Sequence, residues 1–315
     1  MGNRYILIGI LAIVACFGSC QSKSRPAGKA GKGPAADTVV SSELPLPEVP
    51  PTLTVPSERA AYILTHFWDA LDVRDTLRSH DSGFMEQGIV NWLSLFPHAA
   101  EEDLPRCIDA CLDRMVKDKT AFRLLGNVVE QYLNGPNSPM RNETYYILYL
   151  ERVLCLPGLT EEERLRPAYQ LETARKNRPG SLATGFSYLT REGKPGRLRD
   201  TAPGKRLLLL FYDPACVHCT ETLKELYHSP VLERLMADQS LSVLAVYTEG
   251  DRELWDRTKA SLPGEWMVAM DIEGIVEREL YALPAMPVIY LLEKDKTVLL
   301  KDPTPTDLEA WLLLE

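Results

Sequence analysis

The sequence predicts a C-terminal α/β domain, with a central mixed sheet flanked by helices, and an all-α helical domain before it. Two patterns support this prediction. Apolar residues recur at helical spacing from Ser57 to about Asn177, whereas short apolar runs alternate with helical patterns after Gly180. The 315 residues suffice for about two domains. We therefore expect a helical domain over residues 57–178 and an α/β domain over residues 181–315.

The first residues have the layout of a secretory signal. Arg4 is followed by an apolar run of 13 residues from Tyr5 to Phe17 and then by the small residues Gly18 and Ser19. A helix that spans a bilayer needs about 20 residues, so a retained membrane helix is the weaker alternative. The sequence predicts a signal peptide over residues 1–19.

The end of this segment resembles a bacterial lipobox, in which a cysteine follows small residues. The resemblance implies that Cys20 is lipidated and becomes the first residue of the mature protein. We therefore expect a lipoprotein held to a bacterial membrane by acyl chains, outside the cytoplasm and facing the periplasm.

Residues 20–56 are rich in Pro, Gly, Ser and Ala and contain few large apolar residues before Val39. Such a composition cannot bury enough surface to order itself. The segment is expected to be a tether, flexible at first and stiffened by prolines from Pro45 to Pro56.

Residues 57–178 are expected to form roughly five or six helices. Ser57 is the predicted N-cap of the first helix. Prolines, glycines and asparagines separate the helical patterns, which read "ERAAYILTHFWDALDV", "GFMEQGIVNWLSLF", "EDLPRCIDACLDRMVKD", "TAFRLLGNVVEQYLNG", "NETYYILYLERVLCL" and "TEEERLRPAYQLETARKN".

The C-terminal domain begins with a predicted strand and turn in "LATGFSYLTREGK". The run "RLLLLFY" lacks polar alternation, as expected of a strand buried on both faces. The later elements are expected to be a helix from about Cys216 to Met236, the strand "LSVLAVY", a helix near "RELWDRTKASL", the strand "WMVAM", a helix near "EGIVERELYAL", the paired strands "PVIYLLE" and "TVLLK", and a helix from about Pro305 to Leu314, capped by Thr304.

Cys216 and Cys219 lie where the first buried strand gives way to a helix. Free N–H groups and the helix dipole stabilise an anion at a helix N-terminus, and the thiolate is the form that attacks a disulfide. Cys219 lies one helical turn further on, close enough to form a disulfide with Cys216 and release a bound partner. The pair is therefore predicted to be catalytic, with its redox-active disulfide as the only cofactor.

Other interpretations of this cysteine pair are less favoured. A structural zinc site usually needs two such pairs, and the chain has one. Haem attachment would need His after the second cysteine, where Thr220 stands. We expect no metal. A purely structural disulfide remains the serious alternative in an oxidising compartment.

The segment 181–315 resembles the thioredoxin-like superfamily, and more closely the TlpA/ResA-like thiol-disulfide oxidoreductases. Their "FW-x-x-WCxxC" segment reads "FYDPACVHC" here, with Ala215 in place of Trp. The stretch "AMPVIYLLEKDKTVLLKD" resembles the family's cis-proline strand and closing hairpin. The resemblance implies a cis bond between Met286 and Pro287, with both residues in a substrate groove that faces Cys216. The residues from Ser57 resemble a helical domain of unknown function that precedes thioredoxin domains in Gram-negative lipoproteins.

Val217 and His218 stand between the two cysteines. A cation or donor beside the Cys216 thiolate stabilises the reduced form, so we expect a pair more oxidising than thioredoxin. The alternative is that His218 is an ordinary exposed helix residue. Asp213 and Pro214 are expected to shape the turn before the pair.

Three further cysteines, Cys107, Cys111 and Cys155, are expected to be core residues, and a disulfide of Cys155 with Cys107 or Cys111 is the alternative. The formal net charge of -9 disfavours nucleic-acid binding. The sequence thus predicts an extracytoplasmic thiol-disulfide oxidoreductase that acts on protein thiols or disulfides and exchanges electrons with an unidentified redox partner. The alternative is a binding or scaffold lipoprotein whose thioredoxin fold carries an inert disulfide.

Overall fold

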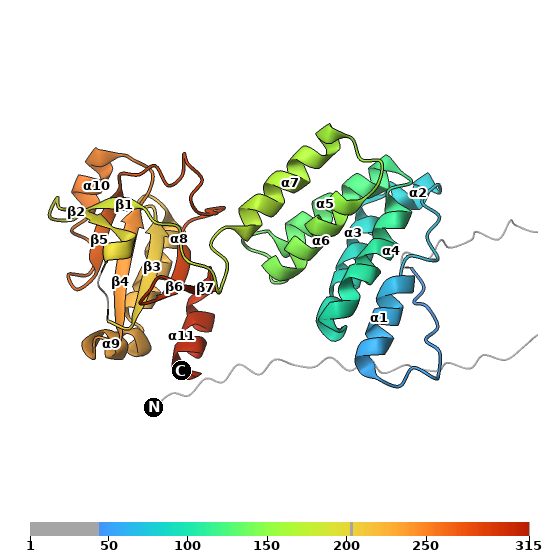
Figure 1. The fold of residues 1–315 in the computed structure, drawn as a ribbon, viewed down its shortest axis with the longest axis horizontal. Coiled ribbons are helices and arrows are strands. Elements are labelled where there is room, and N and C mark those ends of the chain that lie inside the picture. Colours follow the sequence, from blue (N-terminus) through green and yellow to red (C-terminus); the bar gives the residue numbers. More distant parts are fainter. Residues whose placement is uncertain (1–43, 202–203, 315) are drawn as a thin grey trace, which may run out of the picture. The chain divides into compact units, whose positions relative to one another are not determined.

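The structure is a computed structural model that describes residues 44–201 and 204–314 (Figure 1). The predicted signal peptide, Cys20 and most of the predicted tether lie outside the described residues. Within them, helices lead up to Arg175 and a seven-stranded sheet with its own helices follows from Ser187. No helix of the described part is long and apolar enough to cross a membrane.

The helical region contains seven α-helices among the described residues, compared with the five or six expected. The additional helix is α2, a single turn. The α-helices are α1 (Pro56–His66), α2 (Thr76–Ser79), α3 (Ser82–Leu93), α4 (Leu104–Met115), α5 (Lys119–Leu133), α6 (Glu143–Cys155) and α7 (Glu161–Arg175), and two short 3-10 helices span Phe96–His98 and Glu101–Asp103.

The prediction that Ser57 caps the first helix is wrong. Val55 occupies the cap position of α1 and makes no side-chain cap hydrogen bond, and Pro56 starts the helix. Proline suits this position because its fixed φ is helical and its missing N–H would have no partner there. Side-chain caps are present in later helices, as at α5, where Oδ1 of Asp118 accepts hydrogen bonds of 2.9 Å from two backbone N–H groups.

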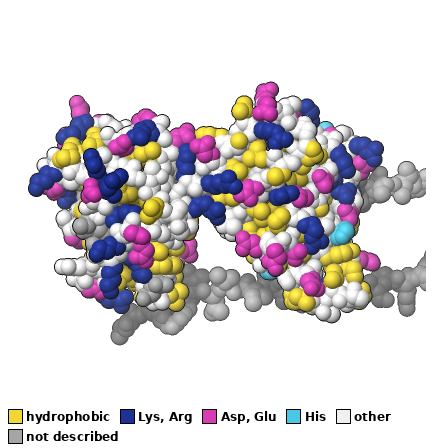
Figure 2. Space-filling model, viewed as in Figure 1, with side chains coloured by type: hydrophobic (Ala, Val, Ile, Leu, Met, Phe, Trp, Pro, Cys, Tyr) yellow, Lys and Arg dark blue, Asp and Glu magenta, His cyan; other side chains and the backbone are white. Residues whose placement is uncertain are grey.

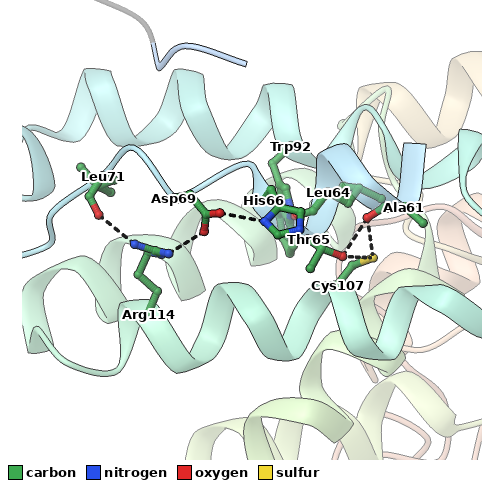
Figure 3. A network of polar contacts seen from close by, with 9 residues as sticks. All are labelled: Ala61, Leu64, Thr65, His66, Asp69, Leu71, Trp92, Cys107 and Arg114. Carbon is green, nitrogen blue, oxygen red and sulfur yellow. Dashed lines mark hydrogen bonds and ion pairs between the residues drawn. The ribbon is translucent and has the colours of Figure 1, made fainter. Parts of the chain in front are cut away.

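Polar contacts connect α1 and the residues after it to α3 and α4 (Figure 3). Nε1 of Trp92 on α3 donates to the carbonyl of Leu64 on α1 across 3.2 Å. Arg114 on α4 donates to Asp69 at 2.6 Å and to the carbonyl of Leu71 at 3.3 Å. These contacts fix the start of the helical region against its buried core.

Two residues in the described end of the predicted tether contact the helical region. Leu44 packs against the hydrophobic core of the helices. Arg59 on α1 donates to the carbonyl of Leu53 across 2.9 Å. Leu44 and Leu53 therefore lie against the helical region, whereas Leu46 between them is exposed.

The sheet has the strand order β2-β1-β5-β4-β3-β6-β7. The central strands β3, β4 and β5 are parallel to one another, and β6 is antiparallel to β3. The strands are β1 (Ser187–Thr190), β2 (Pro195–Arg197), β3 (Arg206–Tyr212), β4 (Leu241–Tyr247), β5 (Met267–Asp271), β6 (Val288–Glu293) and β7 (Val298–Lys301), and the helices are α8 (Val217–Tyr227), α9 (Pro230–Ala237), α10 (Arg252–Thr258) and α11 (Pro305–Leu314).

Strand β3 lies at the centre of two cores. Its residues from Leu207 to Tyr212 are all buried, as predicted for "RLLLLFY". Leu208, Leu210 and Tyr212 belong to the core that includes α8, α9 and α11, and the alternate residues belong to the core on the other face. Side chains on a strand alternate between faces, so each face of β3 is covered.

The expected helix from Cys216 to Met236 is interrupted. Helix α8 ends at Tyr227, and α9 begins at Pro230 with Ser229 as its cap. Oγ of Ser229 accepts from the N–H of Leu232 across 3.2 Å. A proline cannot continue a helix but can start one, so the Ser-Pro pair divides the segment.

The predicted helix in "EGIVERELYAL" is wrong, because this segment forms turns. The carboxylate of Asp271 accepts from the N–H groups of Glu273, at 2.8 Å, and of Ile275, at 2.6 Å. Gly274 and Glu279 have φ values of 81° and 47°. Positive φ is incompatible with a right-handed helix. The segment therefore forms a turn, and the buried Asp271 carboxylate accepts hydrogen bonds within it.

Charged side chains of both signs are interspersed over the visible face of both regions (Figure 2). On that face neither sign forms a continuous area.

Candidate functional site

The residues before the cysteine pair form a tight turn at the end of β3. Oδ1 of Asp213 accepts from the N–H of Ala215 across 2.9 Å, and the carbonyl of Asp213 accepts from the N–H of Cys216 across 3.1 Å. The turn with Asp213 as its side-chain acceptor was predicted. This turn places Cys216 at the start of α8.

Cys216 is the N-cap residue of α8. Its Sγ accepts from the N–H of Cys219 across 3.3 Å and donates to the carbonyl of Met286 across 3.7 Å. The side chain is half-buried and both cysteines are free thiols. A sulfur that receives an N–H at a helix N-terminus is placed where a thiolate is stabilised.

Cys219 has a different environment, because it is fully buried. Its Sγ accepts from the N–H of Asp213 across 3.5 Å. Burial raises the pKa of the Cys219 thiol to about 12, and the neighbouring Cys216 and the charge of Asp213 act in the same direction. The second sulfur is therefore held as a protonated thiol and is more deeply buried than the first.

The Met286–Pro287 peptide bond is cis, as the resemblance implied. Pro287 directly precedes β6, and Val288, the first residue of β6, pairs with Phe211 near the end of β3. This register brings Met286 next to Cys216, in agreement with the contact between the Met286 carbonyl and Sγ.

The two residues between the cysteines point to solvent. Val217 is 73% exposed. His218 is exposed, and its side chain forms no hydrogen bond or ion pair with any residue of the described part. The predicted effect of His218 and Val217 on the thiolate stays a prediction.

The remaining cysteines lie far from this pair in sequence. Cys107 and Cys111 are buried as predicted, and Sγ of Cys107 lies 3.4 Å from Oγ1 of Thr65 (Figure 3). Cys155 is exposed, so the expectation that it is a core residue is wrong. It is the last residue of α6, where a side chain is less enclosed by the helix packing.

Across residues 44–201 and 204–314, no group of three or more His, Cys, Asp or Glu side chains is arranged to hold a metal ion.

Sequence reasoning missed two features of the site. Asp213 was expected only to shape the turn, yet its backbone contacts both cysteines. A pocket of about 370 Å³ also lies beside the turn, with Tyr212 and Pro214 among its lining residues. Three separate segments of the chain line this pocket, so no local pattern could have revealed it.

Comparisons with known proteins agree with this fold. Residues 19–177 match the family model of a domain of unknown function (DUF5106). The crystal structure of a thioredoxin-like protein from Bacteroides caccae is 36% identical and covers 86% of this chain and 98% of its own, with a TM-score of 0.79. The predicted fold class, a thioredoxin-like sheet preceded by a helical region, is confirmed.

Two further solved structures each match a little under half of the chain. One is the C-terminal domain of an uncharacterized protein from Bacteroides fragilis, 36% identical, covering 44% of this chain and 98% of its own with a TM-score of 0.42. The other is the thioredoxin domain of a thiol-disulfide oxidoreductase from Bacteroides vulgatus, 20% identical, covering 44% and 96% with a TM-score of 0.39. No curated protein matches the chain.

Proposed function

Because the chain belongs to the thioredoxin-like proteins that carry an N-terminal domain of unknown function (DUF5106), we propose that it is a thiol-disulfide oxidoreductase. It exchanges disulfides with partner proteins through Cys216 and Cys219.

The unequal environment of the two sulfurs is the observation that supports this proposal most. Sγ of Cys216 is accessible, and the N–H of Cys219 donates to it. Sγ of Cys219 is buried and lies behind it. A dithiol exchange needs one sulfur that a partner can reach and a second that only the first can reach.

The chemistry follows from this arrangement. In the reducing direction, the Cys216 thiolate attacks one sulfur of the partner's disulfide, and the partner's other sulfur leaves as a thiolate. Cys219 then loses its proton and attacks Cys216, which forms the Cys216–Cys219 disulfide and releases the partner's second cysteine. Two electrons pass to the partner, and the reverse sequence oxidises it.

Neighbouring residues complete the proposed site. Met286 and Pro287 form the groove for the partner's backbone next to Cys216. Val217 and His218 tune the stability of the Cys216 thiolate. The redox-active disulfide is the only cofactor proposed, with no metal.

The cellular setting is part of the proposal. Lipidation at Cys20 holds the protein to a bacterial membrane from outside the cytoplasm. Its partners are protein thiols or disulfides, together with a second redox protein that restores the starting state of the pair. The net charge of -9 argues against nucleic acid as a partner.

Trapping tests the proposal directly. Cys219→Ser removes the resolving sulfur, so mixed disulfides with partner proteins are expected to accumulate on Cys216 in cells and to disappear under a reductant. Cys216→Ser is the matched control and should trap none. Equal recovery from the two variants would count against an exchange reaction at Cys216.

A scaffold role is the alternative outcome, and the reduction potential separates the two. An exchanging pair should have a potential between thioredoxin, at about -270 mV, and more oxidising proteins. A value below about -300 mV, with no exchange with a model peptide, is typical of a structural disulfide and would favour a scaffold whose function lies in the helical region.

A further inference from the structure

A pocket lies beside the cysteine pair, and we call it the Tyr212 pocket. The inference drawn from it rests on the proposed exchange activity. Its volume is about 370 Å³. Its walls include Tyr212, Pro214, Leu223, Lys224, Leu262 and Pro263. Ligand pockets are typically about 300 to 1,000 Å³, so this one accepts a single side chain rather than a folded element.

The pocket lies beside the turn that leads to Cys216. Pro214 and Thr220 line it, and Oγ1 of Thr220 donates to the carbonyl of Cys216 across 3.2 Å. Strand β3 lies between β4 and β6. Leu262 and Pro263, which precede β5, form one wall of the pocket. Met286 instead precedes β6, on the other side of β3. A segment bound at Cys216 can therefore contact Met286 on one side and the pocket on the other.

The interior of the pocket is apolar, with one hydrogen-bonding group left over. The hydroxyl of Tyr212 is buried and has no hydrogen-bond partner in the described part of the chain. Arg191 donates through Nη2 to the carbonyls of Leu262, at 3.2 Å, and Pro263, at 3.1 Å, which fixes the opposite wall. The Tyr212 hydroxyl is enclosed and out of reach of an occupant, so the pocket offers a mainly apolar wall.

The charged side chains at the pocket differ in their availability. Lys224 is exposed and makes no ion pair with any residue that the structure describes. The carboxylate of Asp213 is engaged by the N–H of Ala215. Asp213 keeps its negative charge in this contact, but its side chain is half-buried whereas Lys224 is exposed, so the charge at this rim that a partner reaches most easily is positive.

We propose that the Tyr212 pocket selects partners by binding an apolar side chain close to the partner's reacting cysteine, with an acidic residue of the same segment at Lys224. The partner is thus a polypeptide whose cysteine is flanked by an aromatic or large aliphatic residue and a carboxylate. The Tyr212 pocket would then be a second site that determines which partners bind, in addition to the groove at Met286.

Two disulfide-closed peptides test this selection. They differ only beside the reacting cysteine, where one carries Phe and Glu and the other carries Phe and Lys. Single-turnover reduction by the reduced protein should be faster for the Glu peptide, by about fivefold, as expected for a partly exposed charge pair. Lys224→Glu should reverse the order. Arg234→Glu, an exposed charge change on α9, should leave it unchanged.

A third peptide with Ser in place of Phe tests the apolar wall. It should react more slowly than the Phe–Glu peptide in the wild-type protein. Equal rates for all three peptides, or an unchanged order in Lys224→Glu, would overturn the role of the pocket.

Hydroxyethyl disulfide separates the failure of the pocket from the failure of the proposed function. It is neutral and carries neither the Phe nor the Glu side chain, so its reduction by the wild-type protein tests exchange at Cys216 without the pocket. If it is reduced while the peptides are not distinguished, only the selection is wrong. If it is not reduced at all, the exchange activity and the selection are both overturned.

Discussion

The backbone N–H of Asp213 donates to Sγ of Cys219 across 3.5 Å, although Asp213 precedes Cys219 by six residues. The carbonyl of the same residue accepts from the N–H of Cys216. Asp213 therefore connects both cysteines through its backbone and holds the turn through its side chain. Asp213 thus helps to set the relative position of the two sulfurs.

The two thiols are expected to differ strongly in reactivity towards an alkylating agent. Cys216 is half-buried at a helix N-terminus, whereas Cys219 is fully buried. Iodoacetamide at pH 8 should modify Cys216 at least about 100 times faster than Cys219, because only thiolates react and burial excludes the reagent. Peptide mapping by mass spectrometry measures both rates. Comparable rates would contradict the buried position of Cys219.

The buried Cys219 thiol should make the reduced protein less stable in alkali. Its pKa is raised from 9.0 to about 12, so the folded state holds this proton more tightly than the unfolded state does. The stabilisation is fully present below pH 9 and is lost as the pH rises towards 12, by at most about 1.4 kcal/mol per pH unit.

Urea unfolding at pH 8 and pH 10 measures this loss. Reduced wild type should lose about 1 kcal/mol more free energy of unfolding between these pH values than Cys219→Ala does. The other titrating groups are common to both proteins and cancel in the comparison. An equal loss would show that Cys219 titrates normally.

Asp213→Asn is expected to lower the pKa of Cys219. The charge of Asp213 contributes to the raised pKa of that thiol, and asparagine keeps an oxygen that can accept from the N–H of Ala215. The pKa can be followed by NMR of cysteine labelled with ¹³C at Cβ. Glu221→Gln removes an exposed carboxylate from α8 and serves as the control. An unchanged Cys219 pKa in Asp213→Asn would mean that the charge is too well solvated to act.

Two glycines inside helices should respond oppositely to alanine. A Cβ at Gly88 on α3 would lie 3.0 Å from Cη2 of the buried Trp68, so Gly88→Ala should cost about 1 to 3 kcal/mol of stability. At Gly126 on α5 the nearest atom would be 3.8 Å away, so Gly126→Ala should stabilise the protein by up to about 1 kcal/mol. Chemical denaturation compares the two, and a stabilising Gly88→Ala would disprove the close contact with Trp68.

The sequence predicted the parts of the fold whose signals are local. The unbroken apolar run before Cys216 is the buried strand β3, and the two runs after Pro287 are the hairpin of β6 and β7. Thr304 caps α11 as expected, with its Oγ1 accepting from the N–H of Asp307 across 3.1 Å. In each case a few neighbouring residues determine the structure.

The predictions of secondary structure failed where a contact or a backbone constraint overrode the apolar pattern. The run "EGIVERELYAL" suggested a helix, but Gly274 and Glu279 have positive φ values, which a right-handed helix excludes. Ser229 and Pro230 could have been recognised as a cap and first residue, which divides the helix after Cys216. The Tyr212 pocket could not have been predicted, because its walls come together only in the folded sheet.

The complete burial of Cys219 also bears on how the site withstands oxidants. A peroxide that reaches the site meets only Cys216, which it converts to a sulfenic acid. The backbone nitrogen of Cys219 lies 3.3 Å from Sγ of Cys216, and two cysteines at CxxC spacing can form a disulfide, so the Cys219 thiol can condense with the sulfenic acid and expel water. The product is the ordinary disulfide, which a reductant can restore, and the irreversible sulfinic and sulfonic acids are avoided.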